Sequence, residues 1–161
     1  MSESAGCSAP REALAVEALR GSGHLCLQVR GESMLPTLWP GDVAQIAACE
    51  ASDVRRGDIV LAWRDGRFFL HRFLDRNDLG FVTRGDSMPG PDPAFPSEGL
   101  LGRLIGVNRN AMAMKVELRR RRLWSRMIGL LFCYSSIARR AALKLRSRKL
   151  LRPSATDLET A

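Results

Sequence analysis

Residues 24–108 form a succession of short apolar runs separated by turn residues, and this pattern limits the fold more than any other feature of the chain. Residues 24–30 alternate, with Leu25, Leu27 and Val29 on one side, as in a half-buried strand. Further strands are expected at residues 42–48, 58–63, 67–74, 81–84 and 100–108. The pair Asp65-Gly66 is typical of a β-hairpin turn. The predicted fold class is mainly β, with antiparallel pairing.

Changes of composition divide the 161 residues into four predicted segments. The first, residues 1–22, is a tail followed by a short helix at residues 11–20, which Gly21 and Gly23 would end. The second, residues 23–118, is the β domain. The third, residues 119–152, is a basic amphipathic helical segment, and residues 153–161 are expected to be a disordered tail.

The net charge of +8 is concentrated near the C-terminus, since the segment from Arg119 to Arg152 has many Arg and Lys residues and no acid. Such a segment suits an anionic membrane surface, a nucleic acid, or a solvated helix that covers the sheet. Peripheral attachment to anionic lipid is preferred here. No base-reading motif supports nucleic-acid binding.

The expected localisation is cytoplasmic or peripheral to a membrane. Met1 to Arg20 has no continuous apolar run, so no signal peptide is predicted. The longest apolar stretch, Met127 to Ala138, is shorter than the roughly 20 residues that span a bilayer.

The 4 cysteines are widely scattered and form no CxxC pair, which argues against a zinc site and against a disulfide framework. Free thiols are expected, and no metal or cofactor is predicted.

The most informative block is GESMLPTLWPGD, residues 31–42. Pro36 and Pro40 prevent a long helix, so Ser33 is expected on an abrupt turn beside the sheet. Such a turn could expose the hydroxyl and direct backbone N–H groups at one point, as acyl transfer requires. Alternatively, Ser33 is only a helix cap.

A serine nucleophile needs a base, and few residues can supply one. The three lysines, Lys115, Lys144 and Lys149, lie in or beside the basic C-terminal segment. Of the two histidines, His24 has no motif around it and is expected at the surface, whereas His71 lies within the predicted strand at residues 67–74. His71 is therefore the candidate base, because an unperturbed histidine is largely neutral at cytosolic pH. A core histidine bonded to a backbone carbonyl is the alternative.

A histidine base is normally oriented by a carboxylate. Asp86 and Asp92 follow in the loop RGDSMPGPD, residues 84–92, and one of them is expected to orient His71. Asp92 could instead only shape this proline-rich turn.

These segments resemble the signal peptidase I superfamily, which shares its catalytic core with self-cleaving repressors of the LexA type. GESMLPTLWPGD resembles the nucleophile box, RRGDIVL (55–61) the following strand box, LHRF (70–73) the box with the base, and TRGDSMPGPD (83–92) the acidic box. The resemblance covers residues 31–107 and implies a catalytic domain of coiled antiparallel sheets. Because His71 stands where lysine is usual, the chain resembles the archaeal, endoplasmic-reticulum and sporulation-type branch, in which Ser, His and Asp are assigned to catalysis.

The resemblance also implies roles for single residues. It places the catalytic aspartate at Asp92, with Asp86 in the preceding Gly-Asp, and the second oxyanion contact near Gly31. Relatives that process secreted proteins have a membrane anchor, usually N-terminal, and only a charged helix is expected here.

Three apolar residues, Met34, Leu35 and Phe69, are candidates to line a cleft for substrate side chains, although core packing explains such residues as often.

The function predicted from these observations is a signal peptidase I-like serine endopeptidase that cleaves an extended peptide or a preprotein leader. The main alternative is a LexA-like self-cleaving or non-catalytic regulatory protein whose basic segment binds nucleic acid. A third possibility is a pseudoenzyme that has kept the cleft and lost turnover.

Overall fold

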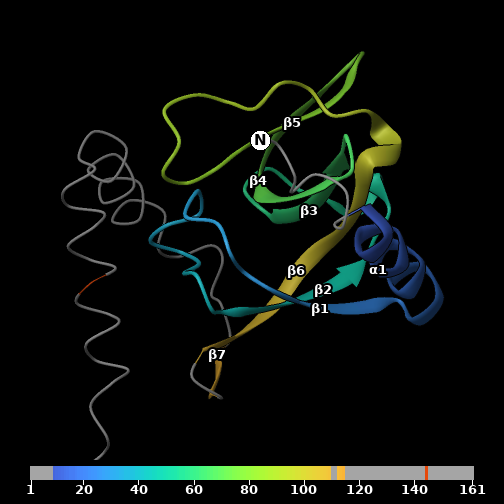
Figure 1. Cartoon of the computed structure of the whole chain (residues 1–161). Helices are drawn as coiled ribbons and strands as arrows, with labels where there is room; N and C mark the ends of the chain where they lie inside the picture. The colour runs from blue at the N-terminus through green and yellow to red at the C-terminus, as the bar shows by residue number, and fades with distance from the viewer. Residues whose placement is uncertain (1–8, 110–111, 115–143, 145–161) are drawn as a thin grey trace, which may run out of the picture.

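The computed structural model describes residues 9–109, 112–114 and 144 (Figure 1). A helix, α1 (Ala9–Ser22), precedes the first strands, β1 (His24–Gln28) and β2 (Val43–Ala48). Three further strands follow, β3 (Ile59–Arg64), β4 (Arg67–Asn77) and β5 (Gly80–Arg84). The last two strands are β6 (Leu100–Arg109) and β7 (Met112–Met114). Short 3-10 turns, Ala51–Asp53 and Ser97–Gly99, precede β3 and β6.

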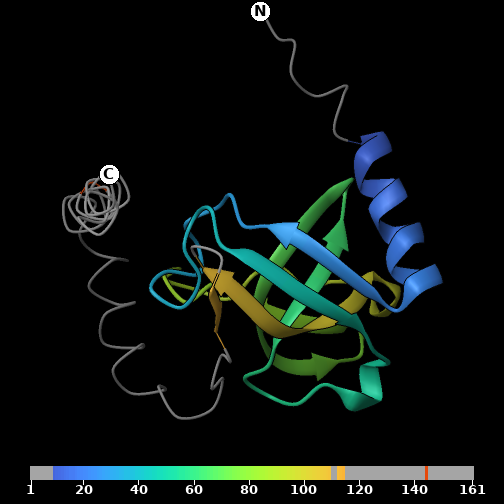
Figure 2. The same cartoon turned by 90° about the horizontal axis from the view of Figure 1, so that it is seen from below.

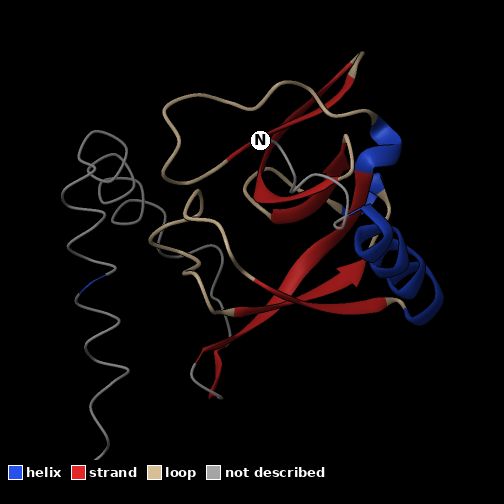
Figure 3. Ribbon diagram, viewed as in Figure 1, coloured by secondary structure: helices blue, strands red, loops and turns tan. Residues whose placement is uncertain are grey.

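The described strands form one 7-stranded sheet in which every pairing is antiparallel. Their order is β1-β2-β6-β3-β4-β5, and β7 pairs with the end of β6. The prediction of a mainly β fold is confirmed, and Figure 3 shows how strands dominate the described residues. The sheet curls, so that α1 lies at one side of it and the long loops after β1 and β5 lie at the other (Figures 1 and 2).

The observed strands differ from the predicted ones most clearly at three places, and the first is β1, which ends at Gln28 and not at residue 30. β4 was predicted to end at residue 74 but continues to Asn77, because a bulge after Phe73 restores its pairing with β5. The sheet also gains β7, which was not predicted, since three residues carry too short a pattern to be recognised.

The β3–β4 hairpin has the turn that the sequence predicts. Asp65 and Gly66 both have positive φ values, 52° and 71°, as a two-residue turn of the I′ type requires. This turn fixes the register in which Val60 lies opposite His71.

The core consists of two hydrophobic clusters on opposite faces of β3. The first cluster is formed by Leu19, Met34, Leu38, Ala44, Ile46, Ile59, Leu61, Leu104 and Val107. The second cluster is formed by Val54, Val60, Ala62, Phe73, Phe81 and Phe95. Since side chains alternate along a strand, β3 supplies residues to both clusters in turn.

Strand β4 divides its side chains in the same way. Phe68 and Leu70 pack against the first cluster, whereas Phe69 packs against the second and Phe73 belongs to it. His71 therefore faces the side of the second cluster, and Arg72 faces the side of the first.

The predicted basic segment at residues 119–152 lies outside the described residues except for Lys144, and so does the predicted tail at 153–161. Within the part of the chain that the structure describes, no helix is long and apolar enough to cross a membrane.

Candidate active site

Ser33 lies in the loop between β1 and β2, which folds as consecutive turns. Backbone bonds join Leu35 N–H to the carbonyl of Glu32 at 3.1 Å and Leu38 N–H to that of Met34 at 3.0 Å. The loop is anchored from below, because Met34, Leu35 and Leu38 are fully buried. The Ser33 side chain is thus held at the top of a packed turn, beside the sheet as predicted.

Two ion pairs hold this loop to the sheet. Asp42, with 0% exposure, accepts hydrogen bonds from Arg109 Nε at 3.0 Å and Nη2 at 2.7 Å. Arg109 Nη2 also donates to the carbonyl of Thr37 at 3.2 Å, and the Thr37 hydroxyl donates to Asp86 Oδ2 at 2.6 Å. Asp86 in turn receives Nε and Nη2 of Arg72 at 2.8 and 2.7 Å. Bidentate pairs of this kind restrict orientation as well as distance.

His71 lies on β4 with only 7% of its surface exposed. Its Nε2 is 2.8 Å from Ser33 Oγ, and its Nδ1 is 2.7 Å from Asp92 Oδ2. An ionised carboxylate can only accept, so Nδ1–H donates to Asp92. The neutral ring then has a free lone pair on Nε2, which accepts the hydrogen bond from the Ser33 hydroxyl. The structure brings together the three residues that the sequence analysis selected for catalysis.

Asp92 lies on the segment after β5, and its environment keeps the carboxylate ionised. Its backbone N–H donates to the carbonyl of Thr83 at 2.8 Å, and the Thr83 hydroxyl donates to Oδ2 at 2.6 Å. Burial raises the pKa of Asp92, but hydrogen bonds from His71 and Thr83 and the charges of His71 and Arg64 outweigh it. The net effect is a pKa below the ordinary aspartate value.

The loop after β5 also contacts the backbone of the Ser33 turn. Ser87 N–H donates to the carbonyl of Ser33 at 2.9 Å, and its hydroxyl donates to that of Glu32 at 2.8 Å. A Cβ on Gly85 would lie 2.6 Å from the Ser33 carbonyl oxygen and 3.0 Å from the Ser33 Cβ. Residue 85 must therefore be glycine for the two loops to approach this closely.

Asp86 does not orient His71, which corrects one prediction. The sequence left Asp86 and Asp92 as alternatives, and the structure selects Asp92 for the contact with the imidazole. The carboxylate of Asp86 instead binds Arg72 and Thr37, because Arg72 points to the opposite face of β4 from His71.

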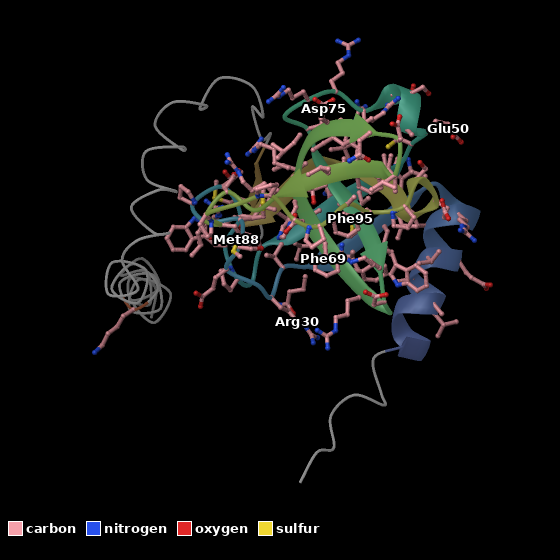
Figure 4. The ribbon with its side chains drawn as sticks, turned by 90° about the horizontal axis from the view of Figure 1, so that it is seen from above. Arg30, Glu50, Phe69, Asp75, Met88 and Phe95 are labelled. Carbon is pink, nitrogen blue, oxygen red and sulfur yellow. The ribbon has the colours of Figure 1, made fainter. Side chains whose placement is uncertain are left out.

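Two of the three predicted cleft residues are also corrected. Met34 has 2% of its surface exposed and Leu35 has 0%, so both belong to the interior and not to a surface that a peptide contacts. Phe69 is half-buried, with its ring edge-on to His71 at 6.0 Å and to Phe95 at 5.3 Å. Figure 4 shows Phe69 and Phe95 side by side.

Gly31 is exposed, two residues before Ser33, and a Cβ built there would have no atom within 4 Å. Its contribution to an oxyanion site stays a prediction. His24 is exposed on the edge strand β1, as predicted for a surface residue.

Three residues that contact the site, Thr83, Gly85 and Ser87, were not predicted as site residues. All three stand within the acidic box TRGDSMPGPD, but sequence alone does not show which residue that loop touches. For Thr83, its inward position in the predicted strand at residues 81–84 was the available signal.

The comparison with protein families found a match. The model of the family described as Peptidase S24-like matches residues 7–83, a range that includes Ser33 and His71 and ends before Asp92. No curated protein matches the sequence. Residues 7–83 are thus similar to the peptidase S24-like family, in agreement with the predicted resemblance to the superfamily that LexA and signal peptidase I share.

Proposed function

We propose that this protein is a serine endopeptidase that cleaves an extended peptide by acyl transfer. Ser33 is the nucleophile, His71 the general base and Asp92 the residue that orients the imidazole. The observation that supports this most directly is the continuous hydrogen-bonded chain of 2.8 Å and 2.7 Å from the Ser33 hydroxyl through His71 to Asp92.

In the first half of the reaction, Ser33 Oγ bonds to the carbonyl carbon of the scissile peptide while His71 Nε2 takes the hydroxyl proton. The ionised Asp92 stabilises the imidazolium that results. His71 then gives the proton to the leaving amine as the C–N bond breaks, which leaves an ester on Ser33. In the second half, His71 takes a proton from water as the water oxygen bonds to the ester carbonyl carbon. His71 then returns the proton to Ser33 Oγ as the C–O bond breaks, which releases the acid and regenerates the hydroxyl.

The tetrahedral intermediates carry a negative oxygen that needs hydrogen-bond donors. The Ser33 N–H is proposed as the first donor and the backbone near Gly31 as the second. The open space around Gly31 supports this assignment, because a substrate carbonyl needs room beside the nucleophile.

The proposed substrate is an extended peptide such as a preprotein leader. The resemblance to signal peptidases implies small residues before the scissile bond. Phe69 is the predicted cleft residue that keeps part of its surface exposed, and it lies beside His71.

The test compares the wild-type chain with Ser33→Ala on a leader-type peptide, with Ser97→Ala as a control. Ser97 is an exposed serine outside the hydrogen-bonded chain. Ser33→Ala should lower the rate by at least about 10³-fold with an unchanged melting temperature, whereas Ser97→Ala should match the wild type. Equal activity of wild type and Ser33→Ala would remove Ser33 from the mechanism.

The family match supports a second candidate, in which the same site cuts its own chain. Incubation of the intact protein, followed by mass spectrometry, would detect this activity. A first-order rate independent of protein concentration would indicate cleavage within one molecule. Cleavage of the Ser33→Ala chain by added wild type would indicate a reaction between molecules.

A further inference from the structure

Arg64, the last residue of β3, binds the segment that carries Asp92. Its Nη1 donates to the carbonyl of Pro93 at 2.9 Å and approaches that of Ala94 at 3.4 Å. The guanidinium carbon lies 4.4 Å from the ring centre of Phe95 and 5.4 Å from that of Phe69. One side chain thus contacts two carbonyls directly after Asp92 and two rings beside the site.

The other edge of the same segment is bound to β5. Asp92 N–H donates to the carbonyl of Thr83, and Phe95 N–H donates to that of Phe81, both at 2.8 Å. The residues from Asp92 to Phe95 therefore lie between β5 on one side and Arg64 on the other. Because Arg64 belongs to the same hairpin as His71, it connects the support of Asp92 directly to the support of the imidazole.

The alternative partner of Arg64 is weak. Its Nε is 3.6 Å from Asp65 Oδ2, but that carboxylate side chain is 88% exposed, and surface pairs of this kind contribute little. The contacts with Ala94 and Phe95 are more enclosed, since the Ala94 bond is partly buried and Phe95 is fully buried, whereas the bond to Pro93 is exposed. A guanidinium can donate hydrogen bonds in its plane while its face stacks on a ring, which a lysine ammonium cannot do.

We propose that Arg64 is a positioning residue that holds Asp92 against His71 by fastening the Pro93–Ala94 backbone to the β3–β4 hairpin. Its effect on turnover rests on the proposed peptidase function, whereas its effect on Asp92 does not.

The experiment uses the full chain and three variants, Arg64→Gln, Arg64→Lys and the control Arg67→Gln. Arg67 lies opposite Arg64 in the hairpin and is exposed. Arg64→Gln should lower kcat about 10- to 100-fold and leave KM nearly unchanged, because Arg64 supports Asp92 and is not expected to touch substrate. Arg67→Gln should match the wild type in both constants.

A second measurement does not depend on activity. The carboxyl carbon of Asp92 and the Nδ1 proton of His71 are followed by NMR. In Arg64→Gln the carboxyl should titrate at a higher pH than in the wild type, and the proton signal should weaken as the hydrogen bond loosens. Arg64→Lys should restore the titration in part, because it restores the charge, but should leave kcat reduced.

These results separate the two proposals. If wild type and Ser33→Ala both fail to cleave, the peptidase function fails and the NMR comparison still tests Arg64. An unchanged Asp92 titration and an unchanged His71 proton in Arg64→Gln would overturn the positioning role, as would full recovery of kcat in Arg64→Lys. Should Arg64→Gln unfold, Arg64→Lys carries the same comparison, with reduced kcat expected and wild-type kcat contradicting the proposal.

Discussion

The two halves of the candidate site are supported in different ways. Ser33 lies above the first hydrophobic cluster, on a turn held by Met34 and Leu38. His71 faces the second cluster from within β4, and Asp92 is joined by its N–H to Thr83 of β5. The nucleophile therefore depends on a folded loop, whereas the base depends on regular sheet.

The polar contacts differ in the same way. The Ser33 loop is fixed by buried ionic groups, with Asp42 bound to Arg109 and Thr37 joined to Asp86. The imidazole of His71 needs only one charged partner, because the hydrogen bonds of β4 to β3 and β5 already fix its backbone. An irregular loop needs side-chain contacts to reach the order that a strand obtains from its neighbours.

The largest effect is expected from removing the charge of Asp92, in the half of the site that contains His71. Asp92→Asn should lower kcat by about 10⁴-fold, because an amide does not hold His71 in the tautomer that accepts the Ser33 proton. Steady-state kinetics with a leader-type peptide measures this. The Ser33 turn should be unaffected. A decrease in kcat of less than tenfold would show that the two halves do not act together.

A slightly smaller effect, on stability, is expected from removing the ion pair that holds the Ser33 loop. Asp42→Asn should lower the free energy of unfolding by about 1.5–3 kcal/mol, since it removes the charge that accepts the hydrogen bonds of Arg109, whose side chain is 26% exposed. Urea denaturation measures the change. Asp65→Asn, at an exposed Arg–Asp pair, is the control and should change stability by less than about 1 kcal/mol. Similar losses in both variants would contradict the importance of the buried pair.

Gly85 tests the junction between the halves. Gly85→Ala would force a Cβ against Ser33, so kcat should fall about 100-fold while the His71 Nδ1 proton signal persists. Gly90→Ala in the same loop is the matched control, because a Cβ there meets nothing within 4 Å. A wild-type kcat for Gly85→Ala would mean that the Ser33 loop and the loop after β5 can move apart without affecting catalysis.

The smallest effect is expected on the pH dependence of the free energy of unfolding. The pKa of Asp92 is lowered in the folded protein, so in acid the unfolded chain binds the proton more readily. The stabilisation from Asp92 is therefore complete well above pH about 4 and is lost as the pH falls through the folded pKa. Urea titrations between about pH 6 and pH 3 should show a shallower decline for Asp92→Asn than for wild type. Asp78→Asn, at an exposed turn, should keep the wild-type slope.

Much of the fold could be predicted because its signals are local. Alternation located the first strand, apolar runs bounded by turn residues located five others, and Asp65-Gly66 located the hairpin turn. The choice between Asp86 and Asp92 could not be predicted from the residues alone, since it depends on which face of β4 each loop residue reaches. The burial of Met34 and Leu35 was missed for a similar reason, because apolar side chains in a turn give no sign of their direction.

The contact of Arg109 with the Ser33 loop has a practical consequence for anyone who shortens this protein. Arg109 is the final residue of β6, yet it donates hydrogen bonds to Asp42 and to the carbonyl of Thr37, which lie 67 and 72 positions earlier in the chain. A version trimmed within β6 would lose this contact with the loop that carries Ser33, so a minimal fragment has to include Arg109.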